Sequence, residues 1–122
     1  MPNAYQTVNV LKLIRETLLP LPGTREGNRL GDIGFYIQKK LLCLLKADGE
    51  TLSLYHHDRD ILIAANPDIY YITPHFQNYP YVLVRLPLIA DEELIPLLIN
   101  AWKLKANKTQ LKAFEMLTKP GA

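Results

Sequence analysis

The hydrophobic pattern of the chain switches repeatedly between helical and strand-like spacing. Residues 3–19 contain neither glycine nor proline, and their apolar residues recur at helical spacing until proline and glycine interrupt them at 20–23. Residues 57–66 and a longer segment that begins at Asp91 return to helical spacing, and residues 109–117 predict a short last helix. Between the helices, short runs bounded by turn residues predict strands at 25–30, 33–38, 41–46, 50–55, 69–73 and 81–86.

This order of elements is typical of an α+β fold, in which helices bury one face of an antiparallel sheet. We expect about five strands, in the order α-β-β-β(-β)-α-β-β-α, because Gly27 weakens the first segment. The run at 41–45 is apolar on both faces, which fits a central strand or a buried helix, and the flanking turns favour a strand. Trp102 shares a helical stripe with Ile95 and Ile99, so we expect it to face the sheet.

Two smaller features concern the helices. Asp58 and Asp91 stand where the second and third helices begin, and their carboxylates are expected to cap the exposed amide groups there. The inner face of the second helix is predicted to consist of Ile61, Leu62 and Ala65.

Length and composition indicate one soluble domain over residues 1–122. With 122 residues, of which 48% are hydrophobic, the chain can bury one core without disulfides. Its single cysteine, Cys43, favours a reducing, cytoplasmic setting. No signal peptide is visible, and no apolar run approaches the about 20 residues that span a bilayer, so we expect a cytoplasmic protein without a membrane partner.

The sequence contains no recognisable catalytic or metal-binding motif. Cys43 lies between two pairs of leucines, which favours a buried apolar role over pairing with His56, His57 or His75 as a nucleophile. Neither metal-ligand spacing nor a glycine-rich phosphate loop occurs. We therefore expect a non-enzymatic protein with no metal and no cofactor.

The connector at 74–80 is unusually rich in rings. Its aromatic residues can stack on bases, with His75 or Arg85 contacting phosphate, or they can cover the sheet edge as a small core, with His75 bonded to the backbone. A pocket that gathers His75, Tyr79 and Arg85 would favour an enzyme instead.

Positive charge is concentrated at the two ends of the chain. Residues 1–47 carry seven basic and three acidic residues, and residues 102–122 carry five basic residues and one acidic residue. The middle of the chain is acidic, and the overall net charge is only +2. If the two ends meet in the fold, they form one basic face that attracts polyanions.

Several segments resemble the MmcQ/YjbR-like family. They are the Leu-Leu-Pro-Leu-Pro-Gly run at 18–23, the Gly-Phe-Tyr-Ile strand at 34–37 with the lysines at 39–40, the stretches 72–76 and 79–86, and Ala101–Trp102 with the lysines that follow. The resemblance covers approximately residues 12–114 and implies an antiparallel α+β domain similar to the secretion-chaperone-like fold. The family is usually labelled DNA-binding, and no catalytic residues come with the resemblance. His75 and Arg85 match family positions.

Together these features predict a domain that binds duplex DNA with little sequence specificity, its basic hairpins and last helices contacting phosphates. The alternative is a protein-interaction or chaperone-like module with a protein partner. The residues expected at the nucleic-acid interface are Arg25, Arg29, Lys39, Lys40, His75, Arg85, Lys103, Lys105 and Lys108.

Overall fold

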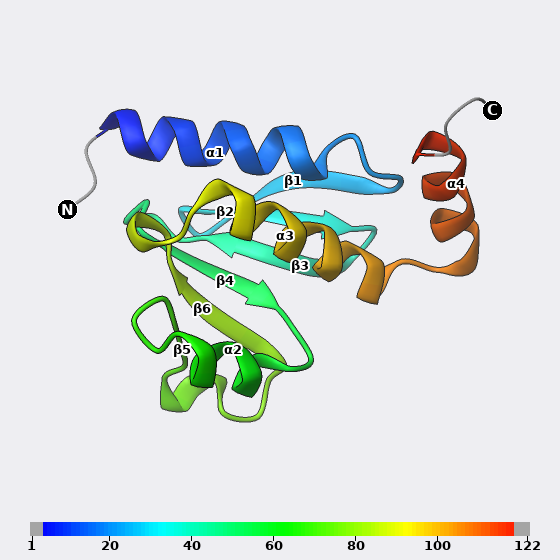
Figure 1. Ribbon diagram of the computed structural model, residues 1–122. Coiled ribbons are helices and arrows are strands. Elements are labelled where there is room, and N and C mark those ends of the chain that lie inside the picture. The colour runs from blue at the N-terminus through cyan, green and yellow to red at the C-terminus, as the bar shows by residue number, and fades with distance from the viewer. Residues whose placement is uncertain (1–3, 119–122) are drawn as a thin grey trace.

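The computed structural model describes the backbone of residues 4–118 and the side chains of residues 9–118. Helices and strands follow one another in the predicted order (Figure 1). The helices are α1 (Ala4–Leu18), α2 (Arg59–Ala65), α3 (Asp91–Lys105) and α4 (Lys108–Thr118), with short 3-10 helices η1 (Pro74–Phe76) and η2 (Leu86–Leu88). The strands are β1 (Thr24–Arg29), β2 (Asp32–Ile37), β3 (Lys40–Leu45), β4 (Thr51–Tyr55), β5 (Tyr70–Tyr71) and β6 (Tyr81–Arg85).

The strands form one antiparallel sheet in the order β1-β2-β3-β4-β6-β5. The predicted α+β class is confirmed, with six strands rather than about five. β1 pairs along its whole length with β2 although it contains Gly27, which lies opposite Gly34. The Tyr36 ring covers both glycines, since a Cβ atom added to Gly34 or Gly27 would lie 2.8 or 3.3 Å from its Cε1 atom. This ring supplies the packing that a glycine pair lacks.

The core lies between the sheet and the helices α1 and α3, which lie side by side over one face (Figure 1). Leu52 and Leu54 of β4 and Val82 and Val84 of β6 point into it and are fully buried. Side chains alternate along a strand, so Ser53, between the two leucines, is on the opposite face. The run at 41–45 lies in strand β3, as the flanking turns predicted.

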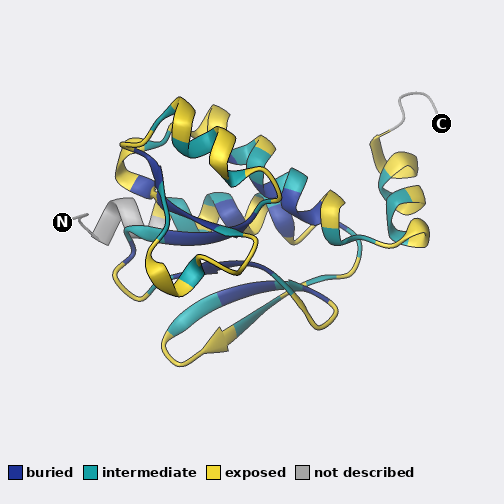
Figure 2. Cartoon of the chain, turned by 90° about the horizontal axis from the view of Figure 1, so that it is seen from below, coloured by how far each residue is buried: buried dark blue, intermediate teal, exposed yellow. Residues whose placement is uncertain are grey.

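Trp102 is fully buried in the core, which confirms that it faces the sheet. Its Nε1–H donates a hydrogen bond to the Pro22 carbonyl at 3.0 Å, and its ring centre lies 5.1 Å from that of Phe114 in α4. α4 itself has no buried residue and projects from the rest of the fold (Figure 2). Leu111 and Phe114 are the α4 residues that pack against the core.

The predictions for the start of the helices and for the inner face of α2 are wrong. Neither Asp58 nor Asp91 makes a capping hydrogen bond, and α3 follows Ala90 with Asp91 as its first residue. In α2, Ile61 is 67% exposed and Ala65 is exposed, whereas Leu62 and Ile63 contact the core. Apolar residues occupy nearly every side of this short helix, so packing against β5 rather than periodicity decides which side is inner.

Within the described residues, no helix combines the length and the apolar character needed to cross a bilayer.

Cys43 is fully buried in β3, and burial raises the pKa of its thiol far above the usual value. Because the thiolate is the reactive form, we expect Cys43 to resist thiol reagents in the native protein and to react after denaturation. Labelling followed by mass spectrometry, with and without urea, measures this difference. Cys43→Ala should fold with a modest loss of stability, and rapid labelling of the native protein would contradict the core assignment.

Candidate functional site

Six of the predicted phosphate-contacting residues lie around the β2–β3 turn and the junction of α3 with α4. The Lys40 Nζ atom lies 3.5 Å from the Lys105 carbonyl oxygen, which joins the turn to the end of α3. Arg25 donates to the Gln38 carbonyl at 3.1 Å and so flanks the same turn. The first and last parts of the chain therefore meet here. We call this set the basic end: Arg25, Lys39, Lys40, Lys103, Lys105 and Lys108.

Aromatic rings position several of these cations. The Lys105 Nζ atom lies 3.9 Å from the centre of the Tyr55 ring, and the Lys103 Nζ atom lies 5.3 Å from that of Phe114. Burial, together with the nearby charge of Lys40, lowers the pKa of Lys105. Two like charges are thus held close together, an arrangement that an anion between them would stabilise.

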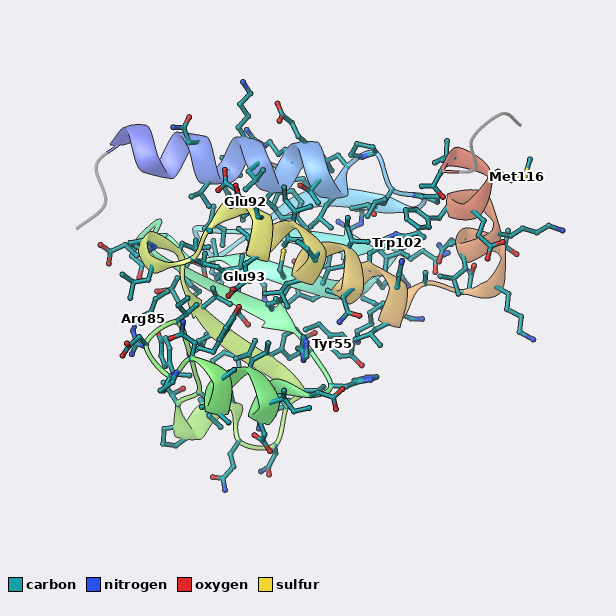
Figure 3. All side chains as sticks on the ribbon, in the orientation of Figure 1. Tyr55, Arg85, Glu92, Glu93, Trp102 and Met116 are labelled. Carbon is teal, nitrogen blue, oxygen red and sulfur yellow. The ribbon has the colours of Figure 1, made fainter. Side chains whose placement is uncertain are left out.

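Arg85 does not belong to the basic end. Antiparallel pairing places it opposite Thr51 at one end of β4, whereas Tyr55, beneath Lys105, is at the other end. Figure 3 shows Arg85 far from Met116 of α4. Its guanidinium donates to the Asp68 carbonyl at 3.1 Å and lies 3.9 Å from the centre of the Tyr71 ring. The predicted interface residues therefore do not share one face.

Arg29 and His75 occupy a third location, a groove of about 600 Å³ on the sheet face opposite α1 and α3. Tyr79 lines this groove together with His75, but Arg85 does not, so the combination that would favour an enzyme is not formed. We call this the sheet groove. Its lining residues are Arg29, Leu30, Asp32, Leu41, Leu44, Lys46, Ser53, His75, Phe76, Tyr79 and Tyr81.

One side of the sheet groove is an aromatic wall formed by His75, Phe76 and Tyr79. The His75 ring centre lies 5.1 Å from that of Phe76 and 6.0 Å from that of Tyr79. The sequence suggested, as an alternative to base stacking, that these rings form a small core with His75 bonded to the backbone. The structure shows this arrangement only in part. Phe76 is half-buried, but His75 makes no hydrogen bond within the described residues, and Tyr79 is 55% exposed.

Arg59, which the sequence did not single out, holds this wall in place. From the start of α2 its guanidinium donates to the carbonyls of Phe76 and Gln77, both at 2.7 Å, and to that of Tyr81 at 2.8 Å. It also donates to the Tyr79 carbonyl. One sequence feature could have drawn attention to Arg59: it is the only lysine or arginine in the acidic segment from Asp48 to Asp68.

Among the side chains of residues 9–118, no three His, Cys, Asp or Glu residues gather where they could hold a metal ion.

Comparison with known proteins identifies the fold. No family model matches the chain. The uncharacterised proteins Rv2570 of Mycobacterium tuberculosis and Mb2600 of Mycobacterium bovis are 47% identical to it over 53 residues. That match covers 43% of this chain and 41% of each relative, so it spans less than half the length of these proteins. Deinococcus radiodurans protein DR2400, a DUF419 domain of known structure, matches with a TM-score of 0.69 and 23% identity over 93% of this chain and 91% of that one. The chain has the fold of this DUF419 domain.

Proposed function

We propose that this chain is a cytoplasmic MmcQ/YjbR-like domain that binds duplex DNA through its basic end, without catalysis. The sequence resemblance and the fold shared with a DUF419 domain support the family. The observation that carries the binding proposal is the meeting of the two basic segments, where Lys40 of the β2–β3 hairpin contacts the end of α3 at Lys105.

The electrostatics of the basic end suit a phosphate backbone. Duplex DNA carries about one charge per 1.7 Å of helix axis, so a cluster of lysines can meet several phosphates at once. Contacts of Lys103 and Lys105 with aromatic rings restrict their side chains before binding, which reduces the entropy that binding removes. Because phosphate contacts carry no base information, low sequence specificity follows.

The test is DNA affinity measured over a range of salt concentrations. With about four to six phosphates neutralised, log K should fall with log salt with a slope of roughly −4 to −5. Reversing Lys103, Lys105 and Lys108 to glutamate should flatten this slope and weaken binding equally for all sequences. Electrophoretic shift or fluorescence anisotropy gives both quantities.

A matched pair separates local contact from overall charge. Lys40→Glu and Lys12→Glu change the net charge equally, but Lys12 lies on α1 beside Glu16, outside the basic end. Lys40→Glu should weaken binding, and Lys12→Glu should have a much smaller effect. If the unaltered protein binds no duplex or single strand even at low salt, the DNA proposal is lost.

If DNA binding is excluded, a protein-interaction module becomes the better-supported function. The apolar side chains of Met116 and Leu117 in α4 are 62% and 68% exposed and could contact a partner. Self-association that Met116→Lys abolishes, measured by sedimentation velocity, would support that alternative.

A further inference from the structure

The sheet groove carries a set of groups that the basic end does not use. Its volume of about 600 Å³ falls within the range of small-molecule sites, about 300–1,000 Å³. Its floor belongs to the central strands β3 and β4, where Leu41 and Leu44 are apolar. The two sets share no residue, so an inference about the groove does not depend on DNA binding at the basic end.

Ser53 is the unusual residue of the floor. It is only 3% exposed, yet its hydroxyl has no hydrogen-bond partner among the described residues. The hydroxyl is nevertheless not sealed off, because Thr24 Oγ1 is the fully enclosed side-chain oxygen without a partner among the described residues. The Ser53 hydroxyl therefore opens into the groove, where its neighbours in the floor are apolar. Because Ser53 lines the groove, it offers a molecule seated there a hydrogen-bonding group in an otherwise apolar part of the floor.

The aromatic wall offers a surface for a planar ring. Tyr79 is 55% exposed, and four hydrogen bonds from Arg59 to the backbone carbonyls fix the segment that carries it. Rings held in this way stack on flat ligands without first having to be ordered.

A positive charge across the groove from the aromatic wall favours an anion. Lys46 is paired with Asp32 at 3.1 Å and is thereby neutralised. The Arg29 side chain makes no hydrogen bond or ion pair with any described residue, although its backbone pairs with Asp32 in the sheet, so its charge is unpaired at the edge of the groove. Its guanidinium can form two parallel hydrogen bonds with a phosphate or carboxylate group.

We propose that the sheet groove binds a planar ring that carries one phosphate, the chemistry of a nucleoside monophosphate unit, either free or within a single strand. The ring stacks on the aromatic wall with a polar edge on Ser53, and the phosphate meets Arg29.

The experiment titrates adenosine monophosphate, adenosine and inorganic phosphate into the isotope-labelled protein and follows its amide signals by NMR. Adenosine monophosphate should shift groove amides saturably and bind about tenfold more tightly than adenosine or phosphate, since only it engages both sides. Arg29→Ala should reduce its affinity to that of adenosine, and Tyr79→Ala to that of phosphate. Ser53→Ala should keep the fold and weaken binding several-fold.

Arg25→Ala is the matched control, because Arg25 lies on the same strand as Arg29 but outside the groove. It should leave nucleotide affinity unchanged. A trideoxyadenylate strand distinguishes the two sources: Arg29-dependent binding of the strand alone supports a strand unit, and binding of the free nucleotide supports a small ligand. The absence of saturable groove shifts with either probe at millimolar concentration overturns the proposal, as does an equal loss in Arg25→Ala and Arg29→Ala.

The proposals for the basic end and for the sheet groove can be disproved independently of each other. The Lys103, Lys105 and Lys108 reversal should keep nucleotide binding in the groove, and Ser53→Ala should keep the affinity for duplex DNA and its salt slope.

Discussion

Trp102→Ala is expected to lower the free energy of unfolding by about 3–5 kcal/mol. The ring is fully buried in the core, and it also anchors α4 through its contact with Phe114. Removing it opens a cavity and leaves the Pro22 carbonyl without its donor. Because a domain of this size is typically stable by only about 5–15 kcal/mol, the variant should unfold at a much lower urea concentration. Circular dichroism measures this midpoint.

Trp102→Phe is the control that separates packing from the hydrogen bond. It keeps a ring in the core and removes the Nε1–H donor to Pro22, so we expect a smaller loss, about 1–2 kcal/mol. In the unaltered protein, Trp102 emission should be blue-shifted and move to the red on unfolding. Native emission at the position typical of water-exposed tryptophan, or a negligible effect of Trp102→Ala, would contradict its place in the core.

The fold could be predicted where burial follows from the sequence pattern over several residues. The burial of Trp102 was predicted correctly, although Ile95 and Ile99, on whose stripe the prediction rested, are only partly buried. The residues of α3 that are buried with it are Leu94, Leu98 and Ala101. The strand at 41–45 followed from an apolar run between turns. In α2 the same reasoning failed, because Ile61 and Leu62 are both apolar and a seven-residue helix does not distinguish between its sides. The strand β1 is weak on its own and forms because Tyr36, from the neighbouring strand, covers Gly27.

The candidate site was less predictable, because it depends on contacts between distant segments. The charge distribution suggested that the two basic segments could meet, but only the fold brings Lys40 to Lys105. It also places Arg85 at the opposite end of β4, which no local signal reveals. Ser53 reads as an ordinary polar residue of an alternating strand, and its significance appears only because the face it occupies forms the floor of a groove.

Arg59→Gln should release the segment that carries the aromatic wall. Four carbonyls between Phe76 and Tyr81 lose their common donor, and an isolated amide cannot reach them all. Because these residues are largely exposed, water replaces much of the lost bonding, and we expect the free energy of unfolding to fall by about 1–3 kcal/mol. The larger effect is local: backbone order parameters at residues 76–80, measured by NMR relaxation, should fall below about 0.6.

Two variants test whether the Arg59 guanidinium itself keeps residues 76–80 ordered. Arg59→Lys keeps the charge but offers a single ammonium on a flexible stem, so it should restore little of the order. Arg85→Gln removes another arginine that donates to backbone carbonyls, those of Pro67 and Asp68, and it should leave residues 76–80 unchanged. If Arg59→Gln keeps both the order of this segment and the nucleotide affinity of the sheet groove, Arg59 does not organise the wall. If both fall while duplex binding at the basic end persists, one arginine outside the groove determines whether Tyr79 can stack on a ring.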